Sequence, residues 1–215
     1  MNKRTVRSVV TLLAVYCGLT AVAFLWGNRL LAAFLPLLGT EIDWLLPAEF
    51  VRTSLSLGAT NGQAQIVLDV ATTVDIAVEG RTAQAGLPAS SSTLQAYALQ
   101  HIALVFSILA AWPAHSLRQR AWLLALGVPC VLISVSLDIP FVLTGLLRQL
   151  WLEQVSRAAS GTDALVVYYE FMHRGGRIGL AVVVALTAAL AVTDLRNAAG
   201  NAAVFGRTRA PLVDH

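Results

Sequence analysis

The stretch AWLLALGVPCVLISVSLDIPFVLTGLL, residues 121–147, decides the class of this chain. Asp138 is its only charged residue, and a helix needs roughly 20 mostly apolar residues to cross a hydrocarbon core of ~30 Å. The stretch is long enough to span a bilayer with a tilt or to run past it. The whole chain is 57% hydrophobic and 13% charged, far from the balance of soluble domains. We therefore expect an integral membrane protein.

Three further apolar stretches have the composition of membrane spans: residues about 9–26, 94–112 and 170–193. The first follows a basic N-terminus and has no small-residue cleavage site after it, which is typical of an uncleaved signal anchor. The last is long enough only if its helix begins upstream of Arg177. The predicted fold is a single α-helical membrane domain over residues 1–215, built as a bundle of four spans.

The basic residues predict how these spans are oriented. They gather in three segments: Lys3, Arg4 and Arg7 at the N-terminus, Arg118 and Arg120 in the tight connection after the second span, and Arg196, Arg207 and Arg209 in the tail. The connections 27–93 and 148–177 are longer and hold most of the acidic residues. Because short cytoplasmic segments carry the excess of Lys and Arg, both termini are expected in the cytoplasm of a bacterial inner membrane.

The first long connection predicts an extracytoplasmic cap over residues 36–93. Apolar residues around Pro36 and Pro47 favour a helix lying at the membrane interface. Alternation of apolar and polar residues then predicts about three antiparallel strands, the last near 74–78, with Asn61-Gly62 as a turn. The uncharged run 86–92 is expected to be a loop. A small sheet is marginal alone, so its apolar face should pack on the helix ends or on a partner.

The second long connection favours helix. Its apolar residues continue the periodicity of the third span through Val155. Ser160-Gly161-Thr162 should break this helix, and Thr162 or Asp163 can cap the next one.

The densest group of polar residues lies at the start of the fourth span. Glu170, His173, Arg174 and Arg177 have the i, i+3, i+4 and i+7 spacing of one helix face, and Glu170 can pair with Arg174. This pattern allows an interfacial anchoring belt, with Arg177 as an exposed anchor. It equally allows a binding site, because charged residues at membrane depth usually face the bundle interior.

His101 and Asp138 are expected to approach this group. They lie about seven and nine residues from the outer ends of their spans, so their depths differ by only ~3 Å. One reading is a structural polar clasp between two helices. The other is the floor of an outward-opening cleft, in which surplus positive charge would bind an anionic lipid headgroup or a peptide carboxylate.

Other kinds of chemistry find no support in the sequence. Cys17 and Cys130 lie inside spans, and there is no CxxC, GxSxG, HExxH, P-loop or GxGxxG context. We therefore predict no catalytic residue, no metal site and no cofactor. No basic patch with interleaved aromatic residues occurs, so nucleic acid is not an expected partner.

The layout of most of the chain resembles that of small bacterial inner-membrane proteins that accompany exosortase-type sorting systems. The shared features are a signal-anchor helix, a short β-rich outer segment and a Gly-Leu-Pro entry to the second span, here Gly86-Leu87-Pro88. The sorting enzymes themselves have more spans and a Cys-Ser-Gly nucleophile step, which Pro129-Cys130-Val131 lacks. The resemblance implies an accessory role rather than transpeptidase activity.

Three classes of function stay open. The first is a non-enzymatic accessory or assembly subunit that works with the bilayer and other membrane proteins. The second is a membrane-embedded enzyme acting on a lipid or peptide through the polar residues above. The third is a transporter subunit, which ranks last because the inner halves of the spans are nearly free of charge.

The predicted topology can be tested by labelling single cysteines with a membrane-impermeant maleimide. With Cys17 and Cys130 replaced by alanine, Asn61→Cys should react from outside the cell and Asn201→Cys only after the membrane is opened. Labelling of both positions from the same side would contradict a chain whose cap and tail lie on opposite sides.

Overall fold

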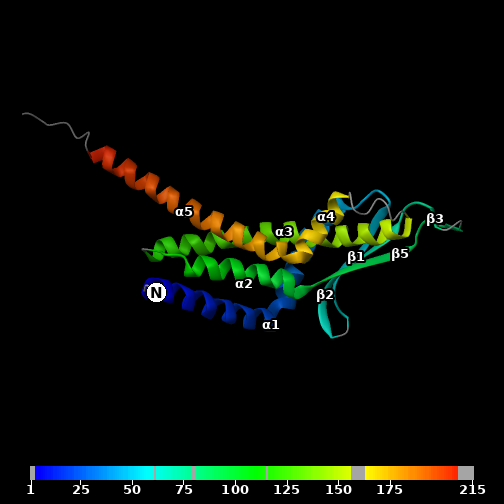
Figure 1. Cartoon of the computed structure of the whole chain (residues 1–215), viewed down its shortest axis with the longest axis horizontal. Coiled ribbons are helices and arrows are strands. Elements are labelled where there is room, and N and C mark those ends of the chain that lie inside the picture. The colour runs from blue at the N-terminus through cyan, green and yellow to red at the C-terminus, as the bar shows by residue number, and fades with distance from the viewer. Residues whose placement is uncertain (1–2, 61, 79–80, 115, 156–162, 208–215) are drawn as a thin grey trace, which may run out of the picture.

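The computed structural model describes residues 3–60, 62–78, 81–114, 116–155 and 163–207. The elements in chain order are α1 (Lys3–Leu45), β1 (Phe50–Thr60), β2 (Gln63–Thr72), β3 (Ile76–Val78), β4 (Arg81–Ala83), β5 (Pro88–Leu94), α2 (Gln95–Ala111), α3 (Leu117–Val155), α4 (Ala164–Phe171), the π-helical turn η2 (Met172–Gly176) and α5 (Arg177–Arg207). The helices run alongside one another with the strands at one end, and the N-terminal end of α1 lies at the opposite end, toward which α5 also runs (Figure 1).

Within the described residues, three helical segments are long and apolar enough to cross a membrane: Thr5–Leu45, Leu117–Glu153 and Ala164–Thr193. The last of these is the continuous run of α4, η2 and α5, so the fourth predicted span does begin upstream of Arg177. The second predicted span corresponds to α2, an apolar helix of 17 residues that follows β5 without a break. The chain is therefore mostly helical, with three clear candidate spans and one shorter apolar helix.

Helix α1 differs from the sequence prediction. Instead of a span ending near residue 26 and a separate interfacial helix from residue 36, one helix continues from Lys3 to Leu45 with Pro36 inside it. Leu31, Leu38 and Ile42 are completely or almost completely buried, so one apolar face extends past the proline. A proline in a helix interior bends it, and α1 turns toward the strands before it ends (Figure 1).

The sheet contains three antiparallel strands in the order β1-β2-β5. Its third strand is not the predicted segment near 74–78, which instead forms a separate hairpin between β3 and β4. The run 86–92, expected as a loop, supplies most of β5 and pairs with β2, for example Ser92 with Val67. The alternation of β5 was hidden because its inward-facing residues, Ser91 and Thr93, are polar although buried.

The apolar face of the sheet is covered by the chain's own helices. Ile66, Leu68 and Val70 of β2 are at most 1% exposed and belong to one core with residues of α1 and α3. At the edge of that core, the Phe50 and Trp151 rings meet edge to face at 4.9 Å between centroids. The sequence analysis left two possible covers for this face, the ends of helices or a partner. In the structure, helices of the same chain cover it.

The junction between α3 and α4 follows the predicted pattern. Helix α3 continues through Val155, and the Asp163 carboxylate caps α4 by accepting from the backbone N–H groups of Leu165 and Val166 at 3.0 and 3.4 Å. Arg148 of α3 donates to the same carboxylate at 3.1 Å. Burial raises the pKa of Asp163, but the hydrogen bonds from Arg148, Leu165 and Val166 together lower it by more. The pKa therefore lies below its ordinary value. The cap is therefore fully formed at neutral pH and weakens only as the pH falls through that lowered pKa.

A glycine permits the close packing of α3 against α4. A Cβ atom at Gly145 would lie 2.5 Å from the Leu165 carbonyl oxygen and 2.8 Å from the Tyr169 Cβ. Gly18, in the exposed part of α1, has nothing within 4 Å of the corresponding position.

We expect Gly145→Ala to destabilise the protein by roughly 1–3 kcal/mol, because the helices must separate to admit the methyl group. In mild detergent this should lower the Tm by several degrees for a chain of this size. Gly18→Ala makes the same chemical change without the contact and should leave the Tm unchanged or raise it slightly, because alanine favours the helix. Equal effects of the two substitutions would contradict the described packing.

Candidate functional site

Three polar side chains from three helices converge beneath the sheet. Nε2 of His101, on α2, lies 2.9 Å from Oδ2 of Asp138, on α3. Nε of Arg177, the first residue of α5, lies 2.9 Å from the other oxygen, Oδ1. We call His101, Asp138 and Arg177 the buried trio. The contact between His101 and Asp138 expected from their matched depths is therefore present.

The buried trio is closed to solvent. The side chains of Asp138, His101 and Arg177 are 0%, 2% and 6% exposed. His101 lies six residues after the start of α2, so the trio sits ~9 Å along that helix from the sheet. Charged groups at such depth are expensive unless they are paired, and here the carboxylate and the guanidinium neutralise one another.

Arg177 also connects the helices to the sheet. Its Nη2 donates to Oγ1 of Thr93, the buried hydroxyl on β5, at 3.2 Å. Its guanidinium carbon lies 4.0 Å from the centroid of the Tyr97 ring, a cation–π contact with the first turn of α2. One side chain therefore contacts β5, α2 and α3. Neither Thr93 nor Tyr97 was predicted to belong to the site: the segment before Thr93 looked like a loop, and no pattern singled out Tyr97 within the second span.

The π-helical turn η2 determines where the four polar residues of the last span point. Gly175, inside η2, has φ = +114°, a backbone conformation that favours glycine. This turn breaks the regular helical spacing between Arg174 and Arg177. Glu170, His173 and Arg174 are exposed, whereas Arg177 is buried. The common face predicted for these four residues does not form, because it required an unbroken α-helix.

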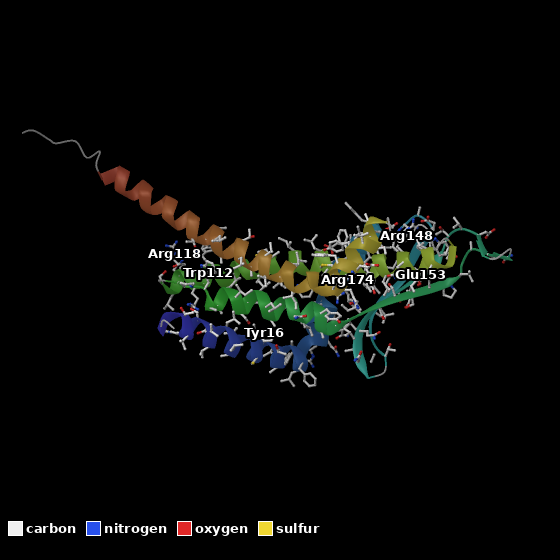
Figure 2. All side chains as sticks on the ribbon, in the orientation of Figure 1. Tyr16, Trp112, Arg118, Arg148, Glu153 and Arg174 are labelled. Atoms are coloured by element: carbon white, nitrogen blue, oxygen red, sulfur yellow. The ribbon has the colours of Figure 1, made fainter. Side chains whose placement is uncertain are left out.

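The three outward residues interact with their own helix. Arg174 Nη2 lies 3.2 Å from Glu170 Oε2, so the predicted i, i+4 ion pair is present on the surface. The His173 ring stacks on Tyr169 at 5.7 Å between centroids. Arg174 lies near the junction of α4 and α5, while Arg148 and Glu153 lie beyond it on the part of α3 near the sheet (Figure 2). The structure thus divides the six predicted site residues into the buried trio and an exposed group of three.

The hydrogen bonding of the buried trio assigns roles to its atoms. An ionised Asp138 can only accept, so Nε2 of His101 carries the proton and Nδ1 of a neutral ring keeps its lone pair. Nδ1 of His101 and Nη1 of Arg177 have no hydrogen-bond partner in the described part of the chain. Nε of Arg177 is at ion-pair distance from Asp138 but is not aligned for a hydrogen bond. The trio is thus a charge pair with an oriented imidazole.

A second polar contact lies one residue before Asp138. The Tyr168 hydroxyl donates to the Leu137 carbonyl oxygen at 2.7 Å. Pro140, three residues later in α3, lacks the backbone N–H that would bond to the Ser136 carbonyl, so the Tyr168 contact lies beside an interruption of the helical hydrogen bonds.

Comparisons with protein-family models, curated proteins and solved structures find no match to this chain. Within the described residues, no three His, Cys, Asp or Glu side chains lie close enough to hold a metal ion together. Its function therefore has to be inferred from the described geometry itself.

Arg177 is buried, although the sequence analysis considered it as an exposed anchor. Its removal should therefore destabilise the protein instead of having little effect on stability. We expect Arg177→Ala to lower stability by about 3 kcal/mol or more, because Asp138 would stay buried without its counter-ion. The matched control is Arg174→Ala, whose side chain is 79% exposed and should cost little. Thermal unfolding in mild detergent measures both, and a similar small loss for the two variants would contradict the buried pair.

Proposed function

We propose that this protein is a non-enzymatic accessory or assembly subunit of a bacterial inner-membrane complex. The observation that carries the proposal is the closure of the buried trio. Its ionisable groups are at most 6% exposed and neutralise one another, which suits a structural clasp better than a site that must admit substrate. The resemblance in layout to proteins that accompany exosortase-type sorting systems points in the same direction.

The proposed topology has four spans, with α2 as the short one. Its 17 residues reach ~26 Å, somewhat less than a typical hydrocarbon core, and local thinning of the bilayer can accommodate the difference. Arg118, the second residue of α3, lies at the same end of the bundle as the N-terminal end of α1 (Figure 2). By the positive-inside rule that end is cytoplasmic, and the sheet is extracytoplasmic.

In this proposal the clasp positions the sheet for a partner. Arg177 connects β5 to the helices, and the buried face of β2 belongs to one core with residues of α1 and α3, so the sheet has little freedom to move against the bundle. The opposite side of the sheet carries polar contacts such as the hydrogen bond from Ser54 to Asp69 at 2.7 Å. The paired strands β1 and β2 extend to one side of the bundle (Figure 1).

The outward-facing anion site has less support than the sequence suggested. The prediction rested on a surplus of positive charge, with Arg174 and Arg177 beside Glu170. In the structure Arg177 pairs with Asp138 and Arg174 pairs with Glu170, so each arginine already has a counter-charge. An anionic lipid headgroup or peptide carboxylate would therefore rely on exposed His173 and Arg174. We retain this site as a minor part of the proposal.

A membrane-embedded enzyme is the second candidate. The observation in its favour is the unpartnered Nδ1 of His101, because a carboxylate-oriented imidazole with a free nitrogen is the arrangement of a general base. The observation against this candidate is the burial of His101.

Purification of the tagged full-length chain from its native membrane in mild detergent discriminates the two candidates. The accessory role predicts a native mass that includes another membrane protein at fixed stoichiometry. His101→Gln keeps a donor for Asp138, so it should preserve both this complex and complementation of a gene deletion. A lipid-bound monomer, together with loss of complementation by His101→Gln at unchanged Tm, would overturn the accessory role in favour of the enzyme.

A further inference from the structure

A groove along α1 combines an apolar lining with a single basic residue. Its volume is about 490 Å³, and its walls include Leu19, Val22, Trp26, Leu30 and Ile102. Arg29 lines the same groove. These α1 residues recur at helical spacing, so they form one continuous face.

Gly27 brings α1 and α2 together beside this groove. A Cβ atom at Gly27 would lie 2.6 Å from Cδ1 of Leu99. The helices therefore meet closely at one point, and the apolar residues on both sides of Gly27 remain accessible from the membrane. Trp26 is 58% exposed, so the wall of the groove is not covered by the rest of the bundle.

The distance along α1 places Arg29 at a membrane boundary. Arg7 and Arg29 are separated by 22 helical residues, which corresponds to ~33 Å. This matches a hydrocarbon core of ~30 Å, so Arg29 lies at headgroup level when Arg7 lies at the other surface. Trp26, whose ring lies 5.2 Å from the Arg29 guanidinium carbon, is a residue type enriched at that level.

Arg29 has no acidic partner in the described part of the chain; its contact there is the Trp26 ring. A guanidinium at a membrane surface binds a phosphate through paired hydrogen bonds. The groove runs from Arg29 along the part of α1 that crosses the hydrocarbon core, where an acyl chain lies.

We propose that this groove is a binding site for an anionic phospholipid, with the phosphate on Arg29 and an acyl chain along Val22 and Leu19. A partner helix would cover the apolar floor but would leave the guanidinium without a counter-charge, so the charge favours the lipid. Under the proposed orientation the lipid belongs to the outer leaflet. The lipid site itself is independent of the accessory role.

Photo-crosslinking in vesicles tests this site. The full-length protein is reconstituted with a trace of phosphatidylglycerol carrying a photoactivatable acyl chain, or with phosphatidylcholine carrying the same chain. We expect phosphatidylglycerol to label the segment 19–33 and the region of Ile102 about five-fold more than phosphatidylcholine, the scale of one basic residue near an anionic surface. Because both leaflets contain the probe, the result does not depend on orientation.

Variants then separate the charge from the groove. Arg29→Gln should reduce labelling to the phosphatidylcholine level, and Val22→Phe should reduce it by partly filling the groove. Arg174→Gln is the matched control: it removes another exposed arginine, one already paired with Glu170, and should leave this labelling unchanged. Each variant is first checked for an unchanged Tm.

Equal labelling by the two lipids, or labelling unaffected by Arg29→Gln, would mean that the groove meets only bulk lipid and would overturn the proposal. Crosslinks from the segment 19–33 to another protein in native membranes, in place of lipid, would overturn it in favour of a partner helix.

Discussion

A carboxylate in the middle of an apolar helix is the constraint on which the rest of this structure depends. Asp138 is fully buried in α3, where an unpaired charge would be very costly. His101 contributes one hydrogen bond. Arg177, whose guanidinium is always charged, supplies the counter-ion and reaches Asp138 from the first residue of α5. The break at Gly175, the exposure of Arg174 and the contact with Thr93 all accompany this placement of Arg177.

The sequence predicted those parts of the fold that depend on local pattern. Apolar length identified α2, α3 and the run from α4 to α5, Asp163 marked the start of α4, and matched depth brought His101 to Asp138; it did not predict that α1 continues past Pro36 to Leu45. It failed where tertiary contacts override the pattern. The inward face of β5 is polar because Ser91 bonds to the Leu143 carbonyl and Thr93 to Arg177, so no apolar alternation marked it as a strand. Likewise, a single glycine with positive φ ended the regular spacing on which the common face of Glu170 and Arg177 relied.

The buried trio and the sheet together stabilise one end of the bundle. The buried trio joins α2, α3 and α5, and the apolar face of β2 belongs to one core with residues of α1 and α3. The end of the bundle that carries the sheet is therefore held by charge and by apolar packing together. The N-terminal half of α1 is less enclosed: no residue from Thr5 to Trp26 is buried. A protein with one firmly held end and one membrane-exposed helix fits our proposal of a subunit that displays a fixed surface while α1 contacts lipid.

A double-mutant cycle tests most directly whether the ion pair between Asp138 and Arg177 holds this end of the bundle together. Asp138→Leu, Arg177→Met and the double variant are compared by thermal unfolding in one detergent. Each single substitution leaves one charge of this pair buried without its partner, and the double substitution removes both, so we expect the double variant to be more stable than either single variant. Losses that simply add would contradict it, because the two side chains would then contribute independently of one another.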